Sequence, residues 1–220
     1  MGFDAPTQKL SLEDKEKIES FFPLADTISS LIGEHCEVVI HSLEALENSV
    51  VKISNGSITG RTIGSPITDL GLKMLAQYEQ NQNQVQEGYF AKNAKGDELK
   101  SATFVITGSK GLPIGLFCMN INLSAPFSEV LKAFLPSVNT PPVQELFSSN
   151  ATDVISESLK NTIIDVDNDS KVMPKQRNKE ITRRLFENGI FELKEATQLT
   201  ALELNISKHA IYKYIREFKS

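Results

Sequence analysis

The side chains best suited to recognition chemistry lie close together near the C-terminus. Their spacing places hydrogen-bond donors and cations on one face of a predicted helix. Such a face suits a helix in the major groove of DNA, where cations contact phosphates and polar groups contact base edges. The predicted DNA-binding residues are Ser207, Lys208, His209, Tyr212, Lys213 and Arg216.

The elements that must position these side chains form a predicted helix-turn-helix over residues 197–216. Ala201 is small enough to let two helices approach, and Asn205 tolerates the left-handed backbone that the turn requires. Ser207 is a good N-cap for the second helix, because its hydroxyl can accept a free backbone N–H. The predicted apolar stripes are Leu199, Leu202 and Leu204 on the first helix and Ile211, Tyr214 and Ile215 on the second, with Ile206 at the corner.

Charge is distributed unevenly along the chain. Residues 171–220 contain 11 Lys and Arg against 6 Asp and Glu, a net +5, whereas the whole chain has 23 against 28, a net −5, which leaves −10 for residues 1–170. A basic tail on an acidic body favours contact of the tail with a polyanion such as double-stranded DNA. Two amphipathic helices with solvated charges would show a similar pattern, so a protein-interaction module is the alternative.

The rest of the chain predicts an α+β fold. We expect a PAS-like domain over residues 1–136, a linker with a connector helix (residues 153–166) over residues 137–174, and an all-α helix-turn-helix domain over residues 175–220. A polar connection is expected over residues 77–86. The predicted helices flanking the sheet are 11–22, 24–32, 68–79 and 124–135, and the five predicted antiparallel strands are 36–40, 50–53, 88–92, 99–107 and 113–122.

Bulk properties narrow the class of protein further. No run of apolar residues is long enough for a membrane span and the acidic start is unlike a secretory signal, so a cytoplasmic protein is expected. Cys36 and Cys118 are far apart in sequence and form no Cys-x-x-Cys pair, which favours reduced thiols over a disulfide framework. His35 and His41 provide too few ligands for a metal or haem site, so we predict no metal and no cofactor.

A second group of polar residues is predicted in the N-terminal domain. Arg61 and Asp69 lie in a Gly-rich segment that must close over the sheet, and together they could hold the carboxylate and the amine of an amino-acid-like effector. An Arg–Asp pair that only fixes the loop is the alternative. Strand residues at alternating positions could line the same cavity, and the predicted ligand-binding residues are Arg61, Asp69, Ser101, Thr103, Cys118 and Asn120.

Six segments of the chain carry a resemblance to a known family: residues 55–61, 64–70, 99–103, 114–120, 189–196 and 206–214. They resemble the YheO-like PAS domains that are joined to a helix-turn-helix. The family implies a bacterial transcriptional regulator, and its D-arginine utilisation regulators act as repressors. Ser57, Asp97 and Ala210 depart from the family pattern, so the resemblance does not specify the effector or the operator. A homodimer is expected on separate grounds, because one short recognition helix reads few base pairs.

The sequence therefore predicts a DNA-binding transcriptional regulator, and the resemblance implies a repressor. Its PAS-like domain would sense a small molecule, mediate homodimerisation, or both. A small-molecule enzyme with a PAS-like body is a further alternative, although the chain contains neither a Gly-x-Ser-x-Gly elbow nor a metalloprotease motif. We predict that the protein is not an enzyme.

Overall fold

The computed structural model describes residues 9–81, 85–135 and 145–219. The chain divides into two compact units, Met1–Val138 and Asn139–Ser220. Each unit has its own buried core. The two units are described separately.

The first unit contains a five-stranded antiparallel sheet in the order β2-β1-β5-β4-β3. This arrangement with flanking helices confirms the predicted PAS-like α+β fold. Glycines in the left-handed conformation make the two tight turns, Gly96 between β3 and β4 and Gly111 between β4 and β5. The strands are β1 Cys36–Ser42, β2 Val50–Ser54, β3 Val85–Lys92, β4 Glu98–Thr107 and β5 Pro113–Asn122.

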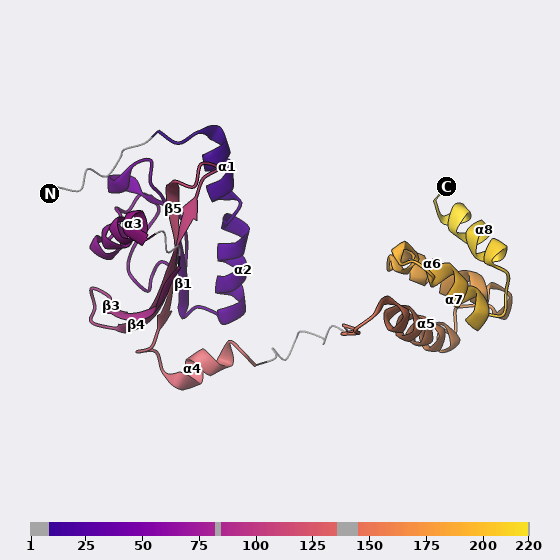
Figure 1. Ribbon diagram of the computed structural model, residues 1–220. Coiled ribbons are helices and arrows are strands. Elements are labelled where there is room, and N and C mark those ends of the chain that lie inside the picture. The colour runs from indigo at the N-terminus through magenta and orange to yellow at the C-terminus, as the bar shows by residue number, and fades with distance from the viewer. Residues whose placement is uncertain (1–8, 82–84, 136–144, 220) are drawn as a thin grey trace. The chain divides into compact units, whose positions relative to one another are not determined.

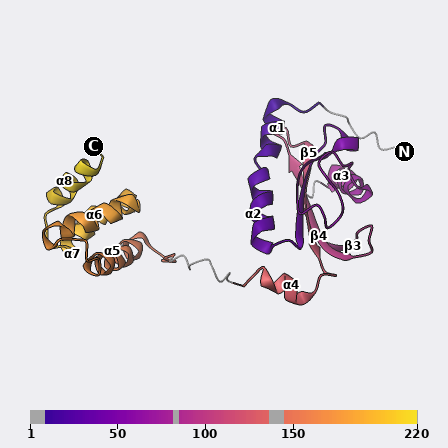
Figure 2. The same cartoon turned by 180° about the vertical axis from the view of Figure 1, so that it is seen from behind.

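Helices cover both faces of this sheet. Figures 1 and 2 show α2 along one face and α3 on the other. Ser11 and Asp14 form a capping box that starts α1, and Pro23 stands in the first turn of α2, where its missing N–H costs no helical hydrogen bond. The helices of this unit are α1 Leu12–Glu19, α2 Phe22–Ile32, α3 Asp69–Asn81 and α4 Phe127–Lys132, with a 3-10 turn at Leu46–Asn48.

Three predicted boundaries are wrong. The expected connection over residues 77–86 is mostly regular, because α3 continues to Asn81 and β3 already begins at Val85; residues 82–84 lie outside the described part. The helix expected over 124–135 is shorter, because Pro126 stands at its N-cap position and only turns follow Lys132. Pro23 does not separate the first two helices, since α2 already begins at Phe22.

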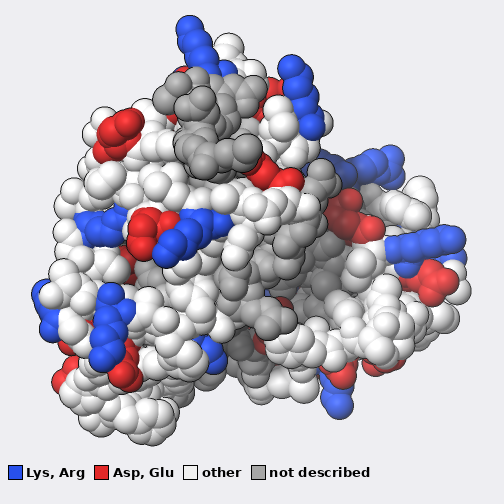
Figure 3. Space-filling model, turned by 60° about the vertical axis from the view of Figure 1, so that its left-hand side comes forward, with Lys and Arg blue, Asp and Glu red and all other residues white. Residues whose placement is uncertain are grey.

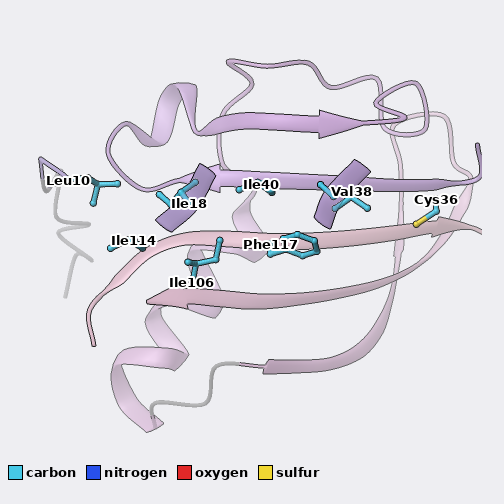
Figure 4. Close-up of a cluster of buried hydrophobic side chains, with 9 residues drawn as sticks. Leu10, Ile18, Cys36, Val38, Ile40, Ile106, Ile114 and Phe117 are labelled. Carbon is cyan, nitrogen blue, oxygen red and sulfur yellow. The ribbon is translucent and has the colours of Figure 1, made fainter. Parts of the chain in front are cut away.

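The main core of the unit lies between the sheet and the first two helices. Alternate residues of β1, Cys36, Val38 and Ile40, point to this side together with Phe117 of β5 (Figure 4). Phe117 stacks on Phe104 with ring centroids 5.1 Å apart. The remaining residues of the same strands therefore face α3, and that face carries the polar groups.

The second unit consists of four helices around one core. Ile181, Leu185 and Ile211 are fully buried in it. Leu159 and Val166 of α5 join the same core, so the helix expected as a connector within residues 137–174 packs as part of the helical unit. The helices are α5 Ala151–Asp167, α6 Arg177–Glu187, α7 Ala196–Glu203 and α8 Lys208–Phe218, with 3-10 turns at Pro174–Gln176 and Ile190–Glu192.

Candidate functional site

The six residues predicted to contact DNA are all exposed on or beside α8. Ser207 caps the helix, since its hydroxyl accepts the N–H of Ala210 at 3.2 Å. The side chains at 208, 209, 212, 213 and 216 share one face, and Ile211 on the opposite face is fully buried. The polar face is thus held outward by the core behind it.

The turn before α8 has the geometry that the sequence predicts. Asn205 is left-handed, with a φ of 51°, and Ala201 and Leu204 are buried in the seam between the helices. The predicted stripe on α7 is wrong in one position, because Leu202 is 69% exposed. The helix begins at Ala196, so positions 196, 200, 201 and 204 face the core and Leu202 falls on the opposite side.

The cations of the helical unit fall into two groups. Those of α6 are neutralised internally: Arg183 and Arg184 bond to Glu180 at 2.6 and 2.9 Å, and these contacts lower the pKa of that carboxyl to about 2. On the face of the molecule drawn in Figure 3, Lys and Arg are interspersed with Asp and Glu. On α8, by contrast, Lys208 and Arg216 are in none of the ion pairs of the described residues, while the charge of Lys213 acts on Glu217 one turn further along the helix and lowers the pKa of that carboxyl after the larger effect of Lys179.

A residue of α7 that sequence reasoning missed contributes to this face. The side-chain oxygen of Gln198 accepts a hydrogen bond from Nζ of Lys208 at 2.9 Å. The amide nitrogen of Gln198 can act as a second donor. The sequence signal for including Gln198 in this face was its position ten residues before Lys208, on the helix that precedes the turn. The two residues border a hollow of about 350 Å³ between α7 and α8, lined also by Ala201, Leu202, Asn205, Ile206 and Ser207.

A row of polar side chains crosses the α3 face of the sheet. Glu37 of β1, Asn120 of β5 and Ser101 of β4 are opposite one another in the strand register. Ser101 donates to the Asn120 oxygen at 2.7 Å, and the Asn120 amide donates to Glu37 at 2.8 Å. The second oxygen of Glu37 accepts the backbone N–H and the hydroxyl of Thr59, at 3.2 and 2.7 Å. The fully buried carboxylate is therefore held by three donors.

The next row contains two further predicted residues. Cys118 pairs with Thr103 in the register, and Thr103 forms a hydrogen bond of 3.1 Å with the hydroxyl of Tyr89. Burial raises the pKa of the Cys118 thiol to about 11, so the thiol is neutral at physiological pH. Burial also raises the pKa of Tyr89. The row of Thr103 and Cys118 thus offers neutral hydrogen-bonding groups next to the row that contains Glu37.

Arg61 is the cation of this face. It is half-buried, it donates to the carbonyl of Pro66, and burial lowers its pKa while the neighbouring Cys118 and Glu37 raise it. Burial, followed by the charge of Arg61, lowers the pKa of His41 to about 4. His41 is therefore neutral at physiological pH, with its Nδ1 2.8 Å from the hydroxyl of Ser49.

The structure brings five of the six predicted effector residues to one face and separates the sixth. Asp69 begins α3, its side chain is 87% exposed, and it lies 3.7 Å from Lys73. The predicted Arg61–Asp69 site is thus wrong in its acidic member, because the first turn of the helix points that carboxylate to solvent. Glu37 is the carboxylate on the sheet face. Its signal was a charged residue inside a β-branched strand, on the same face as His41.

The described residues offer no side-chain cluster for a metal ion and no helix for a membrane span. Within residues 9–81, 85–135 and 145–219, no group of three or more His, Cys, Asp or Glu side chains could hold a metal ion. The same described segments contain no helix that is both long enough and apolar enough to span a bilayer. Both cysteines are free thiols.

Comparison with protein families assigns both units. Residues 12–136 match the YheO-like PAS domain, and residues 154–216 match an HTH domain. The second match includes most of α5, in agreement with the packing of that helix.

Three curated relatives cover nearly the whole chain. The uncharacterised protein YheO of Escherichia coli K12 is 42% identical over 94% of this chain and 87% of its own length. An uncharacterised protein of Haemophilus influenzae is 41% identical over 94% of this chain and 93% of its own. The transcriptional regulator DauR of Pseudomonas aeruginosa is 26% identical over 96% of this chain and 98% of its own.

Proposed function

Since the chain belongs to the YheO-like PAS family, we propose that it is a DNA-binding transcriptional regulator, and specifically a repressor whose PAS-like unit responds to a small effector. The observation that carries the proposal is the exposed cationic face of α8 in the helix-turn-helix. The likeness to DauR, a transcriptional regulator, supports the same role.

In this proposal α8 is the recognition helix and lies in the major groove. Lys208, Lys213 and Arg216 contact phosphates or guanine edges, while His209 and Tyr212 supply hydrogen bonds. Burial of Ile211 fixes the rotation of α8 about its axis, so the same face always meets the DNA. Because one short helix reads few base pairs, two copies would bind half-sites about 34 Å apart.

The effector site of the proposal lies on the α3 face of the sheet. Arg61 would bind a carboxylate, and the buried Glu37 would attract an ammonium group, since no ion pair to it is formed within the described residues. The neutral side chains of Ser101, Thr103 and Cys118 would provide shape and further hydrogen bonds. An amino-acid-like molecule carries both of these charged groups.

The test is binding to DNA from upstream of the protein's own gene, measured over a salt series. We compare the wild type with a variant carrying Ala at Lys208, Lys213 and Arg216. If each cation neutralises one phosphate, the slope of log K against log salt becomes shallower by about 2.7 per copy, and by about 5 for a dimer.

The matched control loses three other exposed cations of the same unit, Lys171, Lys175 and Lys194. It carries the same change of net charge but keeps α8 intact, so its affinity is expected to fall much less. Equal losses in both variants would mean that only the overall charge matters and would refute the recognition-helix assignment.

Two rival functions predict different results. A protein-interaction module would show no DNA binding even at low salt, where phosphate contacts are strongest. An enzyme with a PAS-like body would turn over a small molecule, and the α8 variant would leave that turnover unchanged. The wild-type salt series therefore separates the regulator from both rivals.

A further inference from the structure

One side-chain contact joins the two helices of the helix-turn-helix at its exposed face. Nζ of Lys208, the first residue of α8, donates to the side-chain oxygen of Gln198 on α7 at 2.9 Å. An ammonium group can only donate, so the amide of Gln198 must turn its oxygen toward Lys208 and its NH2 group away. No described residue accepts a hydrogen bond from that NH2 group. The pair therefore presents two neighbouring donors, one charged and one neutral.

The stability of the helical unit does not account for this pair. Both side chains are exposed, so water competes for the hydrogen bond, and holding a lysine in one rotamer costs side-chain entropy. A cation at the first residue of α8 also opposes the helix macrodipole, and the first turn contains no acidic residue to offset it. Lys208 is in none of the ion pairs of the described residues. Its charge thus lacks a partner that folding would provide.

The hollow between α7 and α8 has the composition of a site for an anion. Gln198 and Lys208 both border it, and none of its seven lining residues is Asp or Glu. A phosphate has several acceptor oxygens and a negative charge, so it can accept from the amide and the ammonium at once. A carboxylate-free hollow that is bordered by these two donors therefore suits a phosphate.

We propose that Gln198 and Lys208 together bind one phosphate of the DNA backbone, with the amide of Gln198 and the ammonium of Lys208 as the donors. This inference rests on the proposed function, because it assigns one backbone contact of the same DNA-binding face. It adds a residue of α7 to that face, and it gives Lys208 a positioning role on the backbone.

The bond between the two residues also decides which part of the DNA Lys208 reaches. It holds Nζ of Lys208 toward α7, whereas base edges lie on the floor of the groove that α8 enters. In a helix-turn-helix the first helix crosses the DNA backbone and the second lies in the major groove. The backbone is the part of the DNA that both helices reach, so Lys208 contacts a phosphate, and base edges are left to residues further along α8.

The first experiment measures binding of the full chain to DNA from upstream of its own gene. Gln198→Ala removes one hydrogen bond and should weaken binding about threefold to tenfold per copy. Lys208→Ala removes one phosphate charge contact and should make the slope of log K against log salt shallower by about 0.9 per copy. Because both donors hold the same phosphate, the double variant should lose less affinity than the product of the two single losses.

The second experiment identifies the phosphate. In the same DNA, one backbone phosphate at a time is replaced by a neutral methylphosphonate, and the loss of affinity is measured at each position. Gln198→Ala and Lys208→Ala should both become insensitive to the replacement at the same phosphate and keep the wild-type sensitivity elsewhere. Changes of single base pairs should affect both variants by the same factor as the wild type, because a phosphate contact carries no sequence information.

The substitution Gln198→Glu gives a third test, with a matched control. The carboxylate still accepts from Lys208, but it neutralises that cation and repels the phosphate, so affinity should fall about tenfold or more per copy. The control Gln176→Glu makes the same change at an exposed glutamine in the 3-10 turn before α6 and should bind nearly as the wild type does. Melting temperatures should change little in all variants, whereas a merely structural bond would lower them in Gln198→Ala and Lys208→Ala.

Three results would overturn the inference while the wild type binds DNA. They are wild-type affinity of Gln198→Ala, loss of sensitivity at different phosphates in the two single variants, and a changed base preference in Lys208→Ala. A wild type that binds no DNA even at low salt would contradict the proposed function itself. The two failures are therefore distinguishable in the same set of measurements.

Discussion

Protonation of His41 should destabilise the sheet unit in mildly acidic solution. The side chain is 2% exposed, and burial, followed by the charge of Arg61, lowers its pKa from 6.5 to about 4. Above pH 6.5 the imidazole is neutral in both the folded and the unfolded chain and contributes no pH dependence. Below pH 6.5 the unfolded chain binds the proton first, so stability falls until the folded state also titrates near pH 4.

The size of this effect follows from the two pKa values. A difference of about 2.5 pKa units corresponds to about 3 kcal/mol of unfolding free energy, lost between pH 6.5 and about 4. The assay is urea unfolding at a series of pH values, with the sheet unit monitored by pulsed hydrogen exchange in peptides from β1 and β5. This readout separates the sheet unit from the helical unit.

The comparison that isolates His41 is the variant His41→Asn, whose amide does not titrate. The variant is expected to be less stable at neutral pH, and the gap to wild type should shrink by about 3 kcal/mol as the pH falls to about 4. The control His209→Asn changes a histidine in the other unit and should leave the sheet transition unchanged. A gap between wild type and His41→Asn that stays constant across this pH range would refute the reasoning.

Substitutions at three further positions test the packing and the turns. Ile211→Ala removes a fully buried side chain behind the recognition face, so it should cost the helical unit about 2 to 5 kcal/mol in urea unfolding and should weaken DNA binding. Asn205→Ala should lower stability by about 1 kcal/mol, because the short polar side chain of Asn makes the left-handed φ of 51° tolerable and Ala lacks it, whereas Asn205→Gly should be nearly neutral in the same assay. Gly33→Ala combines a φ of 94° with a clash against Ala133, so the melting temperature of the sheet unit should fall, and an unchanged melting temperature would contradict the close packing of α4.

Local chemistry made much of the fold predictable. The tail was predictable because Asn205 and Ser207 have narrow conformational roles, one in a left-handed turn and the other as an N-cap. The sheet was predictable because glycine turns separate alternating strands. Spacing was less informative in α7, where the first helical residue decides which side faces the core, and a helix of eight residues leaves that choice open.

The effector face was harder to predict because its residues are brought together by strand register. Glu37 and Asn120 are 83 residues apart in sequence and become hydrogen-bonded neighbours only once β1 pairs with β5. The prediction for Asp69 failed in the opposite way. Its place in a Gly-rich segment suggested that it lies near Arg61, but its position at the start of α3 directs its carboxylate to solvent. A single sequence identifies residue types, but the pairing of strands decides which side chains come into contact.

The same distinction applies to charge. The net +5 of residues 171–220 indicated a polyanion-binding tail, yet part of that excess is offset by carboxylates that precede the range: Arg177 pairs with Asp167, and Arg184 with Asp169. These ion pairs link helices or stabilise α6, so the paired cations contribute little to the electric field outside the protein. Lys208 and Arg216 of α8 are in none of the ion pairs of the described residues, and the side chains of Lys208, Lys213 and Arg216 are all exposed. The helix that is capped and anchored to face outward is therefore also the one whose cations remain available for phosphate.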